Sequence, residues 1–174
     1  MSIPPDILIP EVKIRNRVSE LGRQLSSDYS SGRPTVLVGV MRGALYFLAD
    51  LSRTVTVPIE IDFLSVSSYS GTKSSGKVAL SHDTSLDLTG KDVVLVEDIV
   101  DTGRTVSALI RHLALKNPRS LKICALLDKP SRRQVSVPIH YLGFRIADRF
   151  VVGYGLDFDQ SYRNLPYIGV LPST

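Results

Sequence analysis

The chain has 174 residues, of which 43% are hydrophobic and 22% charged, which is the composition of an ordinary globular domain with a core of its own. Its 21 basic and 17 acidic residues give a formal net charge of +4, but the basic residues are scattered and not interleaved with aromatics, which disfavours a nucleic-acid-binding protein. No apolar run approaches the roughly 18 residues of a membrane span, and no signal-peptide pattern is present. Cys124 is the one cysteine of the sequence and has no second cysteine to pair with. Together these features favour a single cytoplasmic domain over residues 1–174.

Hydrophobic periodicity predicts helices alternating with strands along the chain. In chain order we expect a helix at 11–29, a strand at 35–40, a helix at 43–51, a strand at 59–66, a Ser- and Gly-rich loop at 67–77, a strand at 91–96, a helix at 105–115, and strands at 121–127, 139–144 and 150–152. Continuous apolar strands alternating with helices indicate an α/β fold, with a mainly parallel twisted sheet flanked by helices. Residues from roughly 35 to 128 would form the core, and the segments 1–34 and 129–174 a small hood over one sheet edge.

The most informative motif lies where the apolar run of residues 93–96 stops. Two carboxylates, Glu97 and Asp98, follow directly, and Asp101 precedes the turn of residues 102–105, which opens the next predicted helix. Backbone N–H groups at a helix start bind anions, and ligands of parallel sheets bind beyond the carboxyl ends of the strands. The motif therefore predicts a ligand that carries a phosphate together with hydroxyls or a metal.

Other classes of site fit this motif less well. A nucleotide triphosphatase would require GxxxxGK[ST], and residues 39–43 have the wrong spacing and lack the following Lys-Ser/Thr. The GxGxxG pattern of dinucleotide-binding proteins is also absent from the sequence. Helix capping by Asp101 or Thr102 is the plain structural alternative, but it leaves the two preceding acids unexplained.

The order of an apolar strand, two acids, two apolar residues and Asp-Thr-Gly-Arg-Thr resembles the phosphoribosyl-pyrophosphate signature of the type I phosphoribosyltransferases. Residues 39–44, 67–69, 127–133, 150–157 and 162–171 extend the resemblance to the hypoxanthine(-guanine) members over nearly the whole chain. The resemblance implies the type I phosphoribosyltransferase fold and an assembly that is a homodimer or homotetramer. It also implies transfer of the 5-phosphoribosyl group from phosphoribosyl pyrophosphate to N9 of hypoxanthine, and of guanine. A regulator of the same fold, or an enzyme acting on xanthine or a pyrimidine, remains the alternative.

The resemblance also assigns roles to the central motif. It implies a 5′-phosphate site at five consecutive residues, Asp101, Thr102, Gly103, Arg104 and Thr105. It implies that Glu97 and Asp98 hold the ribose hydroxyls, directly or through Mg²⁺, an ion that prefers oxygen ligands. Asp101 would lie near purine N7, either as general base or as a charge that stabilises a protonated purine; the sequence leaves both roles open.

Two further segments would complete the reacting centre by the same resemblance. Arg42 and Gly43 match the loop that binds pyrophosphate, where the family has a cis non-proline peptide, placed here at Arg42–Gly43. Ser68 and Tyr69 match a catalytic loop that closes over the substrates and excludes water.

The C-terminal third would recognise the base. Lys129 matches a lysine that donates to the 6-oxo oxygen of the purine, and an ammonium group, which only donates, favours an oxo over an amino group. Phe150 would stack on the base, although a plain core position is the competing interpretation, and Val151 would contact its edge through the backbone. Asp157 would bind a second Mg²⁺, and Arg163 would contact pyrophosphate.

Five other polar residues are expected to play no part in the chemistry. Arg132 and Arg133 are interpreted as surface or subunit-interface residues. His82, His112 and His140 lack metal-ligand spacing and are interpreted as structural.

Overall fold

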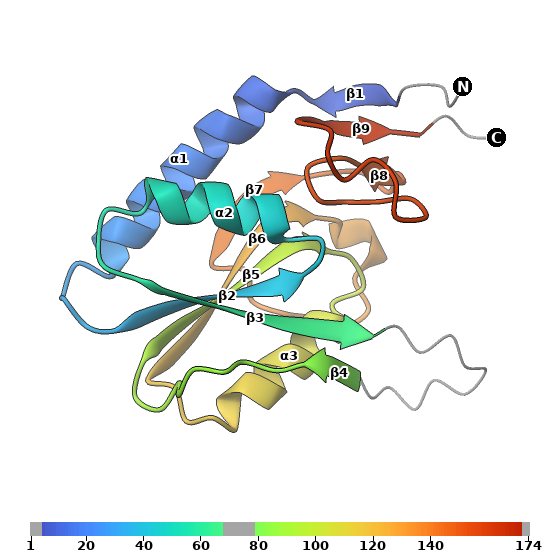
Figure 1. Cartoon of the computed structure of the whole chain (residues 1–174). Coiled ribbons are helices and arrows are strands. Elements are labelled where there is room, and N and C mark those ends of the chain that lie inside the picture. Colours follow the sequence, from blue (N-terminus) through green and yellow to red (C-terminus); the bar gives the residue numbers. More distant parts are fainter. Residues whose placement is uncertain (1–4, 68–78, 172–174) are drawn as a thin grey trace.

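The computed structural model describes residues 5–67 and 79–171 (Figure 1). Its elements in chain order are β1 (Asp6–Ile9), α1 (Glu11–Asp28), β2 (Thr35–Met41), α2 (Leu45–Thr54), β3 (Glu60–Ser67), β4 (Ala79–His82), β5 (Asp92–Val100), α3 (Arg104–Ala114), β6 (Ser120–Asp128), the 3-10 turn η1 (Pro130–Arg132), β7 (Tyr141–Arg145), β8 (Val151–Val152) and β9 (Ile168–Val170). None of the helices in these described ranges is long and apolar enough to cross a membrane.

A six-stranded central sheet with the order β4-β3-β2-β5-β6-β7 forms the middle layer. Five strands run parallel to one another, and only the edge strand β4 is antiparallel to its neighbour. Because both faces of the sheet are covered, the central strand β2 is apolar at every position after Thr35, and β5 is apolar over residues 93–96. The predicted α/β class with a mainly parallel sheet is confirmed.

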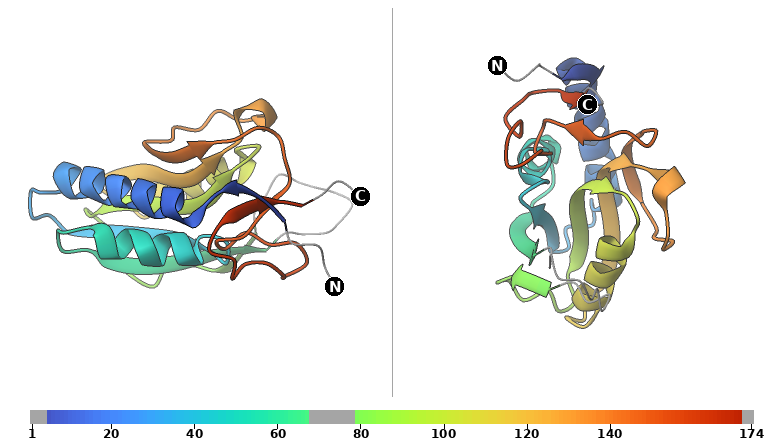
Figure 2. Two further views of the ribbon diagram at one scale, coloured as in Figure 1. Left: turned by 90° about the horizontal axis from the view of Figure 1, so that it is seen from above. Right: turned by 90° about the vertical axis from the view of Figure 1, so that its right-hand side faces the viewer.

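Alternate residues of the central strands point to opposite helical layers. Leu37 and Val94 belong to the core cluster that includes α1 and α2, whereas Val36 and Val93 belong to the cluster that includes α3. Figure 2 shows the same division, with α1 and α2 on one face of the sheet and α3 on the other. This two-sided burial fixes the register of each strand and therefore the side chains at its carboxyl end.

A second, three-stranded sheet with the order β1-β9-β8 joins the two ends of the chain. It lies beyond the carboxyl ends of the central strands, as Figure 1 shows, in the place expected for the hood. The hood is smaller than expected, because β7 is the edge strand of the central sheet and α1 packs on α2 and β7. The backbone pairing of β7 with β6 keeps this segment in the central layer.

One strand end differs from the sequence-based expectation in a way that matters for the site. The predicted strand stopped at Val96, but β5 continues to Val100 and pairs with β6 as far as Asp128. Glu97 and Asp98 therefore lie within the strand and not in the loop after it. The sequence interpretation also missed β1, β4 and β9, which are short and have too few residues to show a clear period.

Candidate active site

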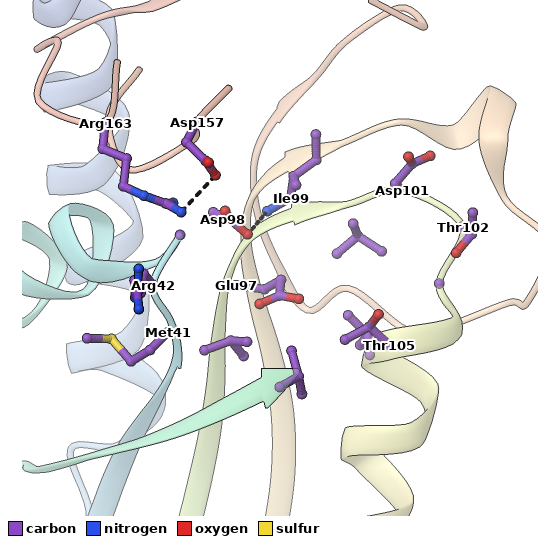
Figure 3. A pocket seen from close by; sticks show the side chains of 16 residues that line it. Met41, Arg42, Glu97, Asp98, Ile99, Asp101, Thr102, Thr105, Asp157 and Arg163 are labelled. Carbon is purple, nitrogen blue, oxygen red and sulfur yellow. Dashed lines mark hydrogen bonds and ion pairs between the residues drawn. The ribbon is translucent and has the colours of Figure 1, made fainter. Parts of the chain in front are cut away.

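A cavity of about 380 Å³ opens at the carboxyl ends of the central strands (Figure 3). Its walls are residues 40–43 at the end of β2, Val66 of β3, residues 97–103 at the end of β5, Thr105 and Val106 of α3, and Asp157 and Arg163 of the C-terminal segment. In Figure 3, Arg42 and Arg163 lie on one side of the acidic pair, and Thr102 and Thr105 lie on the other. The cavity thus has cationic groups at one end, carboxylates in the middle and a helix start at the far end.

The acidic pair in the middle is withdrawn from solvent. Glu97 is 5% exposed, and its Oε2 has no hydrogen-bond partner among the described residues. Burial raises the pKa of Glu97 well above its usual range, and the neighbouring charge of Asp98 raises it further. Burial also raises the pKa of Asp98 to about 6. The Ile99 N–H, which donates to Asp98 over 2.8 Å, lowers this pKa but does not offset the effect of burial. A hydroxyl or a cation at this position would relieve both carboxylates.

The far end of the cavity is the start of α3. Gly103 precedes the helix with a φ of +81°, and a Cβ there would overlap the carbonyl oxygen of Val135. The first turn of any helix presents N–H groups with no acceptor within the helix, which suits a phosphate. Thr102 and Thr105 add hydroxyls to this wall, whereas the side chain of Arg104 is exposed and lies outside it.

The cationic end begins at the turn after β2. The cis peptide bond is Met41–Arg42, one residue earlier than the expected Arg42–Gly43. A Cβ at Gly43 would overlap the carboxylate of Asp98, so glycine lets the turn approach the acidic pair. This close approach brings the Arg42 backbone to the cavity wall beside Asp98.

A second group of polar residues from the C-terminal segment closes the same end. Arg163 Nη2 lies 2.8 Å from Asp157 Oδ1, and Arg163 Nη1 donates to the Gly155 carbonyl over 2.6 Å. Gln160 accepts from Arg42 Nη1 over 3.0 Å and donates its backbone N–H to Asp157 over 2.9 Å. Gln160 Oε1 also accepts from Arg163 Nη2 over 3.2 Å, so the two guanidinium groups share one acceptor, and both arginines line the first cavity, where they could bind an anion.

A second cavity, of about 400 Å³, adjoins the first and shares Asp98, Ile99, Asp101 and Asp157 with it. Its remaining walls come from irregular segments and β8, namely Lys129, Arg132, Asp148, Phe150, Val151 and Leu156. Lys129 is 7% exposed and Val151 is buried, but the Phe150 ring is 55% exposed and stands edge-on to Phe158. An open aromatic face beside a buried ammonium group suits a flat ring that carries an acceptor.

Two arginines that the sequence interpretation placed at the surface or at a subunit interface lie close to the site. Arg132 lines the second cavity, and its Nε lies 3.0 Å from Asp101 Oδ1. Arg133 pairs with the buried carboxylate of Asp128 and is largely buried itself. Arg132 is exposed, as the sequence interpretation expected, but it also lines the site, whereas Arg133 lies mostly inside the protein; a position at a subunit interface stays a prediction. In the structure, Val100 of β5 pairs with Asp128 of β6, which sets the residues that follow β5 beside those that follow β6. A prediction that these two strands are parallel neighbours would have placed both arginines near Asp101.

The remaining predicted residues fall into two groups. Ser68 and Tyr69 lie outside the described residues. The three histidines line neither cavity: His112 Nε2 lies 3.0 Å from Asp83, His140 Nδ1 accepts the Ile123 N–H over 3.0 Å, and His82 ends β4. These contacts agree with the structural interpretation of His112 and His140.

The donor set of the first cavity fits Mg²⁺. Asp157 is close enough to Asp98 for its charge to raise the pKa of Asp98, and Glu97 offers a buried oxygen that has no hydrogen-bond partner among the described residues. In the chain as described, no three His, Cys, Asp or Glu side chains could hold a metal by themselves. Mg²⁺ is usually held by one or two carboxylates together with substrate phosphates and water, which is the arrangement these residues could offer.

Comparison with known proteins places this site in context. Residues 11–159 match the family model described as the phosphoribosyl transferase domain. The chain is 52% identical to the hypoxanthine phosphoribosyltransferase of Salmonella typhimurium over 166 residues, which cover 94% of this chain and 93% of that protein. It is 46% identical to the hypoxanthine-guanine phosphoribosyltransferase of Mycobacterium tuberculosis over 95% of this chain and 85% of that one. A crystal structure of a hypoxanthine-guanine phosphoribosyltransferase from Bacillus anthracis superposes with a TM-score of 0.91 at 43% identity, covering 96% of this chain and 98% of that one.

Proposed function

The chain belongs to the phosphoribosyl transferase family, and we propose that it transfers the 5-phosphoribosyl group of phosphoribosyl pyrophosphate to N9 of hypoxanthine, and of guanine, in purine salvage. The products are IMP or GMP and pyrophosphate. The observation that carries the proposal is the order of groups along the first cavity, with the second cavity at its side. Arginines, carboxylates and a helix start follow one another as do the pyrophosphate, the ribose hydroxyls and the 5′-phosphate of the donor substrate (Figure 3).

Each moiety of the donor substrate then has a partner. The 5′-phosphate accepts hydrogen bonds at residues 101–105, where Arg104 contributes through its backbone because its side chain is exposed. The ribose hydroxyls donate to Glu97 and Asp98, which removes the cost of leaving these carboxylates buried without a partner. Arg42 and Arg163 bind pyrophosphate, with the turn at Gly43 beside it.

The base occupies the second cavity. Its ring stacks on Phe150, the backbone at Val151 contacts its edge, and its 6-oxo oxygen accepts from Lys129 Nζ. Lys129 is buried at the end of β6, so an amino group at position 6 would leave the ammonium without an acceptor. This mismatch disfavours adenine.

The reaction needs little covalent participation from the protein. N9 attacks C1 as the bond from C1 to the pyrophosphate oxygen breaks, and the purine loses its imidazole N–H proton to Asp101 or to solvent. Positive charge therefore develops on the ribose and on the purine, and negative charge on the leaving group. Asp101, shared by the two cavities, faces the developing charge on the purine, and Arg42 and Arg163 stabilise the leaving group. When bound at Asp98 and Asp157, or at Glu97, Mg²⁺ supplies further positive charge to the pyrophosphate oxygens. Ser68 and Tyr69 stay predicted members of a closing loop.

The proposal extends to three properties of the whole molecule. We infer one domain over residues 1–174, a homodimer or homotetramer, and a location in the cytoplasm. Gel filtration with light scattering tests the assembly, and a mass equal to a monomer of 19.1 kDa would contradict it.

A panel of bases tests the function. Purified protein, phosphoribosyl pyrophosphate and Mg²⁺ are combined with hypoxanthine, guanine, xanthine, adenine or uracil, and the nucleotide formed is measured by chromatography. IMP should form fastest, GMP should form as well, and adenine and uracil should give background levels only. Preferred use of xanthine or uracil would replace the proposed base, and no nucleotide from any base would overturn the proposal.

A further inference from the structure

The loop after β5 and the turn after β6 are joined by a set of backbone hydrogen bonds. Lys129 N–H donates to the Val100 carbonyl over 3.0 Å, and the N–H groups of Gln134 and Val135 both donate to the Thr102 carbonyl over 3.0 Å. The turn that carries Lys129 is therefore fastened to the loop that carries Asp101. Any side chain that crosses from one to the other acts between two segments already held in place.

Arg132 is such a side chain. Its Nε forms an ion pair with Asp101 Oδ1 at 3.0 Å, and its Nη1 lies 3.5 Å from Oδ2 of Asp148, which also lines the second cavity. All three side chains are about half exposed, at 48%, 38% and 51%, and ion pairs with this exposure contribute little to folding stability. Any effect of the pair is therefore expected to be local, at the Asp101 carboxylate, which lines both cavities.

We propose that Arg132 is a positioning residue that acts through Asp101: it binds one carboxylate oxygen and leaves the other directed at the purine, while Asp148 holds the guanidinium from behind. The inference rests on the proposed function, because it concerns the base that Asp101 faces. A guanidinium can contact both carboxylates at once through Nε and Nη1, whereas a lysine ammonium at the same position reaches one of them at best.

Kinetics of Arg132→Gln and Arg132→Lys test this role. Arg132→Gln should lower kcat with hypoxanthine about 10- to 100-fold, because a misplaced catalytic group costs rate, and should change KM for phosphoribosyl pyrophosphate less than about twofold. Arg132→Lys should recover part of kcat. Arg145→Gln is the matched control, since Arg145 lies 3.7 Å from Asp128 near the same turn but is 75% exposed and lines neither cavity. It should behave like the unchanged protein.

A double-mutant cycle separates action through Asp101 from direct action on the substrates. In the Asp101→Asn background, Arg132→Gln should cause less than about a twofold further loss of kcat. Two results would overturn the inference: an Arg132→Gln enzyme with unchanged kcat, or the full loss appearing again in the Asp101→Asn background. Failure of the proposed function is distinguishable, because the unchanged protein would then form no nucleotide from any base.

Discussion

The two cavities share one wall but are built from different kinds of structure. The first is formed largely where regular elements end or begin, at β2, β5 and α3, whereas the second is formed largely by irregular chain around Lys129 and between Asp148 and Asp157. Sheet pairing fixes the first, whereas backbone hydrogen bonds between loops, together with side-chain contacts, fix the second. The first site is thus formed by the ends of the central strands, whereas most of the second is formed by chain outside the central sheet.

The electrostatics of the two cavities differ in the same way. In the first, burial raises the pKa of Glu97 and of Asp98, so the protein surroundings disfavour the charged form of both carboxylates. In the second, Lys129 and Arg132 bring positive charge next to Asp101 and Asp148. Ligand binding therefore relieves an electrostatic cost in the first cavity and makes selective hydrogen bonds in the second.

The largest expected effect comes from Asp101, because it belongs to both cavities. Asp101→Ala should lower kcat with hypoxanthine about 10²- to 10⁴-fold, the usual range for losing a group that moves a proton or stabilises the charge at the reacting centre. The midpoint of thermal unfolding should hardly change, since the side chain is partly exposed. Near-normal turnover by a folded variant would contradict the assigned role.

Lys129 tests the base cavity alone. Lys129→Ala should lower kcat/KM for hypoxanthine about 10- to 100-fold, because a hydrogen bond from a buried charged donor is lost. The affinity for phosphoribosyl pyrophosphate, measured by calorimetry, should stay the same. Lys91→Ala is the control, as Lys91 pairs with Glu60 away from both cavities. Weaker binding of phosphoribosyl pyrophosphate with unchanged use of hypoxanthine would reverse the assignment.

Asp98 tests the electrostatic cost in the first cavity. The pKa of Asp98 in the folded protein, about 6, exceeds the value of 3.8 for a free side chain, so ionisation destabilises the fold. The cost is absent below pH 4, grows between pH 4 and 6, and is complete above pH 6. Without Mg²⁺ or substrate, Asp98→Asn should therefore raise the free energy of unfolding by about 3 kcal/mol at pH 8 and leave it unchanged at pH 4.

Urea unfolding at the two pH values measures this difference, and Asp87→Asn is a control of opposite sign. The backbone N–H of Thr89 lowers the pKa of Asp87, so its substitution should reduce stability at pH 8, if it has any effect. An Asp98→Asn variant less stable than the unchanged protein at pH 8 would show that burying the ionised carboxylate does not destabilise the fold.

The smallest expected effect is that of Phe150. Phe150→Leu should raise KM for hypoxanthine about three- to tenfold and leave kcat nearly unchanged, because stacking on an exposed ring contributes modestly. Phe158→Leu removes the ring that stands against Phe150 but lines neither cavity, and its effect should be smaller. Equal effects of the two substitutions would mean that Phe150 stabilises the packing around Phe158 and does not stack on the base.

Sequence reasoning was most successful where spacing is tied to regular structure. The apolar run before Glu97 and the turn before α3 predicted an anion site at a strand end, and the structure brings Glu97, Asp98, Thr102 and Thr105 to one cavity. It misjudged the end of β5, because pairing with β6 extends the strand through two carboxylates that local preference would expose.

The second cavity was harder to predict for a physical reason. Lys129, Phe150 and Val151 were expected from a family resemblance, and the structure brings them together, but Arg132 and Asp148 were not expected to face the site. They meet across irregular chain, which carries no periodicity, and a half-exposed arginine has the pattern of any surface residue.

A crystal structure of the protein with IMP tests most directly the claim that one cavity holds ribose 5-phosphate and the other holds the base. The account predicts the phosphate at the N–H groups of residues 101–105, the ribose hydroxyls at Glu97 and Asp98, and the purine on Phe150 with its 6-oxo oxygen in hydrogen-bond contact with Lys129 Nζ. A phosphate bound away from the start of α3, or a purine in the first cavity, would contradict it.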